Sequence, residues 1–179
     1  MYGSRIRLSI SAAEAAALFR RVAAGAHSPA QALAALTALE TLVGSFTETA
    51  DQPLDAYAEI RRALHADIDE QRQRLLRQQA EALGGALGAG DVTGVARVHA
   101  ALSREAFLQV AERCLTGLAG EVRAGYEVWI ARWCAEAEKR ARGASPYPDA
   151  MDWDAAGVSL GEFMAMRDLS IALKGHADC

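Results

Sequence analysis

The sequence has 179 residues, of which 51% are hydrophobic but only 6% aromatic, so it is long enough for one domain whose core is built mainly from small side chains. Its formal net charge is -4, from 19 basic and 23 acidic residues. This balance gives no broad positive field to attract phosphate groups, and we therefore expect no nucleic acid partner.

Cysteine usage and hydropathy indicate an intracellular protein. The three cysteines, Cys114, Cys134 and Cys179, have no CxxC spacing, so they predict neither a disulfide framework nor a zinc site and fit a reducing compartment. The first ten residues lack the apolar stretch of a signal peptide, and no apolar run approaches the roughly 20 residues of a membrane span. We expect a cytoplasmic protein without a transmembrane segment.

A short arm and a first helix are predicted at the start of the chain. Residues 5–10, RIRLSI, alternate in polarity as a short extended segment would. Ser11 and Glu14 have the spacing of a capping box, in which each side chain accepts from a free backbone N–H of the other residue. The Ala-rich run that follows predicts a helix that Gly25 closes.

A second helix is predicted from Pro29 to near Gly44, with Ser28 as its N-cap. Its apolar residues recur at three- and four-residue spacing: Leu33, Leu36, Leu39 and Val43. The resulting hairpin, 11–44, has the layout of a helix-turn-helix, but its second helix has no Lys or Arg to contact a DNA backbone. The sequence therefore favours a packing unit over a DNA-binding one.

A third helix is predicted over about 53–83, on the order of 45 Å long. Its apolar residues form a narrow stripe: Leu54, Tyr57, Ile60, Leu64, Ile68, Leu75 and Leu83. The stripe suits either a packing face or adsorption to an apolar surface. The glycines of GGALGAGD, Gly84 to Asp91, are expected to end the helix, and this segment lacks the Lys and the preceding strand of a phosphate-binding loop.

Asp91 is predicted to cap a short helix, after which one continuous helix is expected over about 102–142. Gly117, Gly120 and Gly125 are its weak points. Its apolar residues keep mainly three- and four-residue steps: Phe107, Val110, Cys114, Leu118, Val122, Tyr126, Trp129 and Trp133. We expect this helix to be the antiparallel partner of the third, with its aromatic end either in the core or anchored at an apolar surface.

Residues 143–158 are rich in Gly, Pro, Asp and Ser, which indicates a linker after a helical bundle over 1–142. Ser159 and Glu162 form a second predicted capping box, opening a last helix over 159–175. This helix either docks on the bundle or holds a partner protein. The fold class expected is all-α: a helical bundle with two long antiparallel amphipathic helices, an N-terminal helical hairpin and a short C-terminal helix.

The sequence predicts no catalytic, cofactor-binding or metal-binding residues. On a helix His65 and Asp69 share a face, but two ligands do not make a metal site. His176 and Cys179 lie at the chain end, where fraying is expected.

Nucleophilic catalysis is not indicated either. Cys114 and Cys134 fall mid-helix without a glycine elbow or a nearby His. Asp152 and Asp154 are paired carboxylates in the expected linker, where nothing suggests the desolvation needed for acid catalysis. An enzyme stays open as a less favoured alternative, because distant residues can converge in a fold.

From Leu39 to about Trp133 the order of features resembles the phasin family. The segment ETLVGSF is followed by a long polar-backed helix, a break at GAGDVTGVARVHAAL and a second long helix. The break, GDVTGVARVHAALSREAF, resembles the phasin turn with its acidic residue, and AGYEVW resembles a Tyr-containing stretch farther along.

The resemblance implies a non-catalytic protein that coats polyhydroxyalkanoate granules, stabilises them against coalescence and self-associates. The competing hypothesis is an assembly or secretion adaptor that binds another protein's helix through the same apolar residues. In either case the predicted interaction surface consists of Leu54, Tyr57, Ile60, Leu64, Ile68, Leu75, Tyr126, Trp129 and Trp133.

Overall fold

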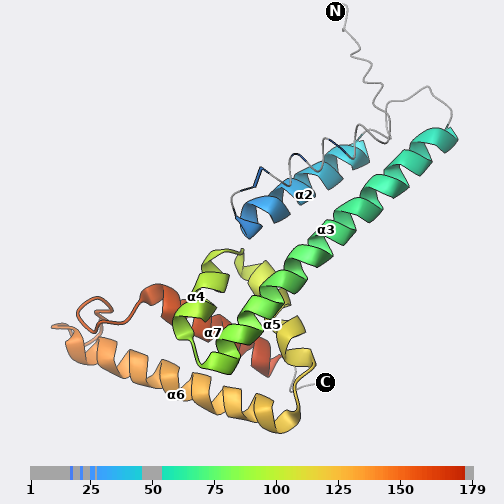
Figure 1. Cartoon of the computed structure of the whole chain (residues 1–179). Helices are drawn as coiled ribbons and strands as arrows, with labels where there is room; N and C mark the ends of the chain where they lie inside the picture. Colours follow the sequence, from blue (N-terminus) through green and yellow to red (C-terminus); the bar gives the residue numbers. More distant parts are fainter. Residues whose placement is uncertain (1–16, 18–20, 22–24, 27, 46–53, 176–179) are drawn as a thin grey trace, which may run out of the picture. The chain divides into compact units, whose positions relative to one another are not determined.

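The computed structural model describes residues 17, 21, 25–26, 28–45 and 54–175, with the backbone alone at 42–45 and 54–61. Within these residues the protein has six helices and no strand (Figure 1), which confirms the predicted all-α class. Internal contacts divide the chain into two compact units, Met1–Leu75 and Leu76–Cys179, and each is described by itself. The predicted arm, 5–10, and the capping box of the first helix lie outside the described residues.

The N-terminal unit contains helix α2, Pro29–Ser45, and the first part of helix α3, Leu54–Ala89. The Ser28 hydroxyl accepts from the N–H of Gln31 at 3.2 Å, so the predicted N-cap of α2 is confirmed. Leu36 of α2 and Ile68 of α3 are buried together, with three half-buried leucines packed against them: Leu33, Leu39 and Leu75.

Helix α3 is longer than predicted, because it continues through Gly84, Gly85 and Gly88 to Ala89. Leu83, before the glycines, and Leu87, between Gly85 and Gly88, are both buried, so packing offsets the backbone entropy that glycine loses in a helix. The helix ends at Gly90, whose φ of 64° closes a Schellman motif: Gly90 N–H donates to Leu87 O at 3.1 Å, and Asp91 N–H to Ala86 O at 2.9 Å.

Helix α4, Val92–Ala100, begins as predicted at Asp91, whose carboxylate accepts from the N–H of Gly94 at 2.9 Å. The prediction of a single continuous helix over about 102–142 is wrong. Residues there form α5, Arg104–Thr116, and α6, Gly120–Ala144, separated at Gly117–Ala119.

Two of the three predicted weak points therefore lie at this break, where Gly117 is the C-cap of α5 and Gly120 the first residue of α6. Gly125, in contrast, is helical. The break lets the two helices follow different directions, and both pack against helix α7, Leu160–Lys174. The expected single antiparallel partner of the third helix consequently does not form.

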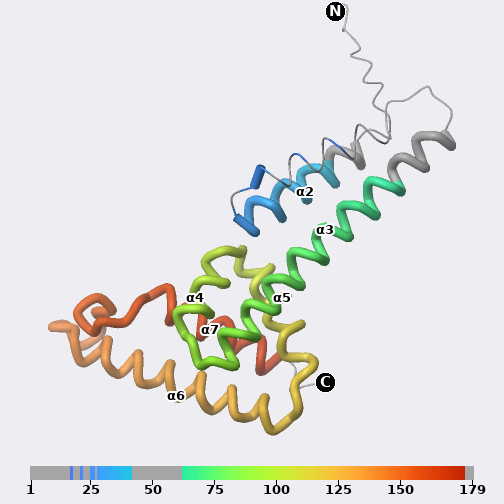
Figure 2. The backbone as a smooth tube through the Cα atoms, viewed as in Figure 1, coloured from blue at the N-terminus to red at the C-terminus, as the bar shows by residue number. Residues whose placement is uncertain are grey.

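The residues expected as a linker fold back on the end of α6 (Figure 2). Asp152 N–H donates to Ala141 O at 2.9 Å, and the Arg140 guanidinium donates to Ala156 O at 2.9 Å. Trp153 then lies against Phe163 of α7 with ring centroids 4.4 Å apart. The later part of this segment is thus held by hydrogen bonds to α6 and by aromatic packing against α7.

Helix α7, Leu160–Lys174, packs against α4, α5 and α6 and supplies much of the core of the C-terminal unit (Figure 1). Its buried apolar residues are Phe163, Ala165, Met166, Leu169, Ala172 and Leu173. Ser159 caps it, since its hydroxyl accepts from Glu162 N–H at 3.4 Å. The Glu162 carboxylate instead accepts from Thr93 Oγ1 at 2.7 Å, and so ties α7 to α4.

Candidate functional site

The predicted interaction surface on α3 is largely covered where its side chains are described. Ile68 is only 1% exposed, against Leu36, while Leu64 and Leu75 are half-buried. The side chains of Leu54, Tyr57 and Ile60 lie outside the described residues. The described part of this stripe therefore serves as packing within the N-terminal unit.

The predicted aromatic surface on α6 has two different environments. Trp133 packs against an internal cluster of Ala137, Val158 and Phe163. Tyr126 and Trp129 are half-buried and contact each other, with ring centroids 6.4 Å apart. Val122 and Val128, on the same helix, are 46% and 69% exposed. The earlier part of α6 thus combines exposed valines with half-buried aromatic rings, whereas Trp133, also half-buried, packs against the internal cluster.

A second apolar surface lies on α7, on the side opposite its buried residues. Leu160, Met164 and Ile171 are 53%, 38% and 44% exposed. Arg167 and Lys174 are exposed at the next positions of the same helical face. The five residues follow one another at steps of four, three, four and three, which is the spacing of a coiled-coil face. We call them the α7 stripe.

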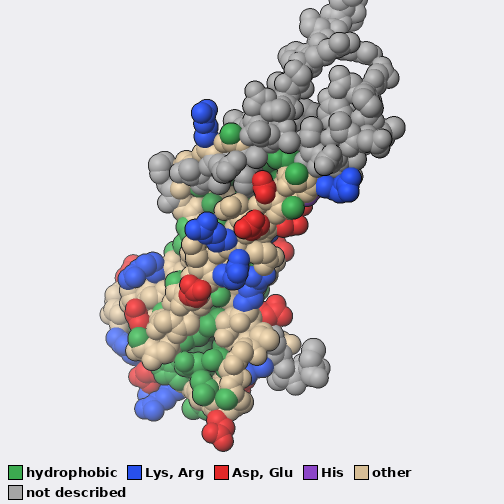
Figure 3. All heavy atoms as spheres, turned by 45° about the vertical axis from the view of Figure 1, so that its right-hand side comes forward, with side chains coloured by type: hydrophobic (Ala, Val, Ile, Leu, Met, Phe, Trp, Pro, Cys, Tyr) green, Lys and Arg blue, Asp and Glu red, His purple; other side chains and the backbone are tan. Residues whose placement is uncertain are grey.

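The α7 stripe stands on a well-anchored helix. On the buried side the Asp168 carboxylate, 2% exposed, accepts from Arg104 Nε at 3.0 Å and lies 3.1 Å from His99 Nε2. At the C-terminus the Arg123 guanidinium donates to Leu173 O at 2.6 Å, where basic side chains stabilise free carbonyls. Three neighbouring helices thus fix the orientation of the stripe. Figure 3 shows hydrophobic side chains gathered on one face of the C-terminal unit, in the lower part of that view.

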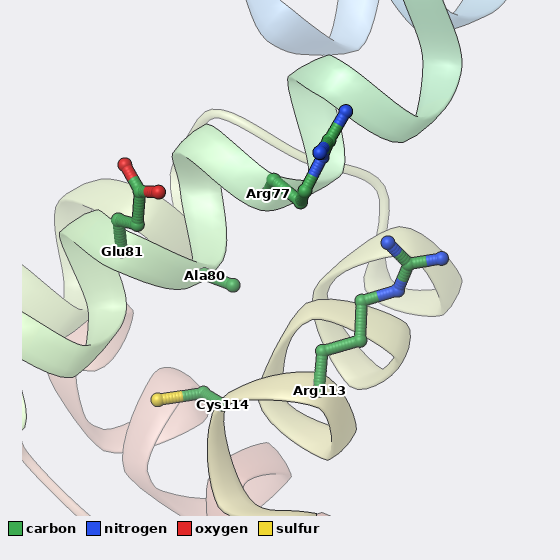
Figure 4. Close-up of a pocket in the computed structure, with 5 residues that line it drawn as sticks. All are labelled: Arg77, Ala80, Glu81, Arg113 and Cys114. Carbon is green, nitrogen blue, oxygen red and sulfur yellow. The ribbon is translucent and has the colours of Figure 1, made fainter. Parts of the chain in front are cut away.

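A pocket of about 480 Å³ lies between α3 and α5 of the C-terminal unit (Figure 4). Its lining residues are Arg77, Ala80, Glu81, Arg113 and Cys114. The two arginine side chains extend toward one side and the side chains of Glu81 and Cys114 toward the other. The pocket is wide open, and charges of both signs line it, so it does not provide the apolar enclosure typical of small-molecule sites.

The thiols do not have the surroundings of nucleophiles. Burial raises the pKa of the Cys114 thiol. Burial also raises the pKa of Cys134, assisted by the nearby Glu138 carboxylate and opposed by Arg167. Both thiols therefore stay protonated at neutral pH, whereas reactive cysteines have a lowered pKa.

The other predicted chemical groups are not brought together as a site. Among the described residues, no group of three His, Cys, Asp or Glu side chains could hold a metal ion. His65 lies on α3, and the Asp152 carboxylate accepts from the N–H of Ala155 at 2.9 Å as part of a turn. His176 and Cys179 lie outside the described residues.

No family model, curated protein or solved structure matches the chain. The resemblance to phasins therefore stays a prediction. No helix in the described part of the chain is both long enough and apolar enough to cross a membrane.

The α7 stripe is not among the predicted site residues, although the sequence of the last helix contains a signal for it. Ile171 follows Phe163, Met166 and Leu169 in this helix, yet Ile171 is exposed and the other three are buried. A helix with apolar residues on all sides carries two stripes, and only one of them can face the core. Leu160, Met164 and Ile171 lie on one side of the helix by their spacing, and Phe163, Met166 and Leu169 lie on the other.

Proposed function

We propose that the protein is a non-catalytic helical adaptor that binds another protein through the α7 stripe. The observation that carries this proposal is the exposure of Leu160, Met164 and Ile171 at coiled-coil spacing on a helix whose opposite face is buried. Such spacing presents a narrow row of side chains into which the knobs of a second helix fit. The enzyme alternative gains no support from the open pocket or from the protonated thiols.

A granule coat, implied by the phasin resemblance, is the second candidate. It is supported by the half-buried Tyr126 and Trp129 beside exposed Val122 and Val128, because aromatic rings are favoured where an apolar phase meets water. Burial of Ile68 makes α3 a less suitable coating surface than its sequence pattern predicts. Self-association through the long helices stays a prediction, which light scattering can test.

Two measurements on the full chain separate the candidates. In the first, tagged protein is used to capture partners from its native host, with Met164→Ser/Ile171→Ser as the stripe variant and Val128→Ser as the matched control on α6. An adaptor should retain one stoichiometric protein with the control and lose it with the stripe variant. Equal recovery by both variants, or none by the wild type, would reject the adaptor function.

In the second, the same proteins are mixed with polyhydroxybutyrate particles and tryptophan emission is followed. A granule coat should adsorb at high salt, shift its emission to shorter wavelength and adsorb less strongly when Val128 is replaced by Ser. An adaptor should be enriched on the particles no more than an inert helical protein. Circular dichroism of each variant checks that its helices are intact.

A further inference from the structure

We infer that the partner of the α7 stripe is an amphipathic helix with acidic side chains in its apolar face. This inference rests on the proposed adaptor function and adds the chemistry of the partner. It draws on the spacing of the stripe, the sign of its charges and the arrangement of the charges beside it.

The spacing favours a helix over a flat surface. Five residues from Leu160 to Lys174 span about 21 Å at 1.5 Å per residue, which corresponds to about two heptads. The row is one residue wide, because Phe163 and Asp168 on its two sides are buried. Adsorption to a membrane is favoured by a broad, uninterrupted apolar face, whereas Arg167 and Lys174 interrupt this row.

The charges favour an acidic partner. Arg167 and Lys174 interrupt the apolar residues, both are exposed, and neither has a salt bridge within the described part of the chain. The nearest carboxylate along α7, Asp168, points inward and is already bonded to Arg104 and His99. The stripe therefore presents positive charge that a partner's Glu or Asp side chains would complement.

A second copy of this chain fits the stripe poorly. In a parallel in-register pair, Arg167 and Lys174 would each face their own copies. In an antiparallel pair, Arg167 of each copy would face Met164 or Ile171 of the other, which would bury the guanidinium group without a counter-charge. Like charges placed opposite one another, or charges buried without a partner, are destabilising in a coiled-coil face. Pairing of the stripe with a second copy of this chain is therefore unfavourable.

The test uses the full chain and two synthetic helical peptides of about 21 residues. Both peptides carry Leu at the positions that face Leu160, Met164 and Ile171. At the positions that face Arg167 and Lys174, one peptide carries Glu and its matched control carries Lys. Fluorescence anisotropy measures binding at low and high salt, and vesicles of phosphatidylcholine with phosphatidylserine serve as a third probe.

The acidic peptide should bind at least about tenfold more tightly than the basic one at low salt, and salt should reduce the difference. Arg167→Glu/Lys174→Glu should reverse the preference. Met164→Ser/Ile171→Ser should weaken binding of both peptides, and Lys139→Glu on α6 should change neither. All five substituted residues are exposed in the fold, so circular dichroism should be unchanged.

The inference would be overturned if the two peptides bound equally or if neither bound. It would also be overturned if the protein bound vesicles through Arg167 and Lys174 but bound no peptide. The failure of the inference is distinguishable from that of the adaptor function. If a partner is recovered from the host only when the stripe is intact, but the acidic peptide is not preferred, the adaptor function stands and the acidic helix is rejected as its partner. If no stripe-dependent partner is recovered and the acidic peptide is not preferred, both the adaptor function and the acidic partner are rejected.

Discussion

The buried Asp168 joins three helices of the C-terminal unit. It lies on α7, and its carboxylate meets Arg104 at the start of α5 and His99 near the end of α4. The His99 ring also packs edge-on against Phe107, with centroids 4.8 Å apart. A buried carboxylate is costly unless it is paired and hydrogen-bonded, and here both partners of the carboxylate come from other helices.

Asp168→Ala should lower the free energy of unfolding by about 2–4 kcal/mol, because the ion pair with Arg104 and the polar contact with His99 are lost. Arg104 is 63% exposed and can be hydrated after the substitution, which keeps the cost below that of stranding a fully buried cation. Urea unfolding measures the change. Asp149→Ala, at an exposed loop position, is the matched control and should fall within about 0.5 kcal/mol of wild type. A loss below 1 kcal/mol for Asp168→Ala would count against this account.

Cys114 and Cys134 should react slowly with iodoacetamide, because only the thiolate attacks and burial raises the pKa of both thiols. Because the pKa of each thiol is higher in the folded than in the unfolded chain, the thiols also make the stability depend on pH. The stability that each neutral thiol contributes is present below the pKa of the unfolded chain and is lost as the pH rises toward the folded value.

In a Cys179→Ser background, alkylation near pH 8 should be at least about tenfold slower in the folded protein than in urea. The pH profile of the reaction in the folded protein should be displaced upward. Mass spectrometry of the labelled peptides gives each rate separately. Equal rates in the folded and unfolded chain would contradict the burial of these thiols.

At the scale of elements, the glycine-rich end of α3 shows how packing and local propensity compete. Gly85 is helical and exposed, with open space where a Cβ would be, whereas Gly90 has a φ of 64° and ends the helix. Two glycines five residues apart in one segment thus have opposite roles.

Gly85→Ala should raise the free energy of unfolding by about 0.5–1 kcal/mol, since alanine loses less backbone entropy in a helix. Gly90→Ala should lower it by about 1–2 kcal/mol, because a left-handed conformation is unfavourable for a residue with a Cβ. Thermal and urea unfolding of the two variants test the pair together. Changes of the same sign would show that α3 does not end where the structure places its end.

The elements that local chemistry specifies were predictable, and those that depend on packing were not. Ser28, Asp91 and Ser159 cap their helices as the sequence predicts, because a cap needs only a side chain and a nearby N–H. The extension of α3 past Gly84 depends on the burial of Leu83 and Leu87, which adjacent residues do not reveal.

The same distinction applies to the candidate site. Leu64 and Ile68 have the sequence pattern of an interaction surface, but whether such a stripe meets α2 or the solvent is decided by tertiary contacts. In α7 the sequence indicates apolar residues on both faces, and only the positions of α4, α5 and α6 show which face stays open. The residues were identifiable from the sequence, whereas their exposure was not.

At the scale of the whole molecule, the α7 stripe is a surface suited to binding, and the helices around α7 are the framework that holds it. The C-terminal unit buries one face of α7 against three helices and anchors it through Asp168 and the Leu173 carbonyl. A fixed helix loses little conformational freedom when it binds, so an exposed apolar row on it is well suited to recognition. The central claim is that this row contacts a partner protein in the cell.

Site-specific photo-crosslinking in the native host tests that claim most directly. A photoreactive benzoylphenylalanine is placed at Met164 in the α7 stripe and, in separate control proteins, at the exposed positions Val128 and Lys139 of α6. The account predicts one dominant crosslinked protein from position 164, absent from both controls and lost when Arg167→Glu is added. A crosslink of equal yield from all three positions, or none from position 164, would contradict it.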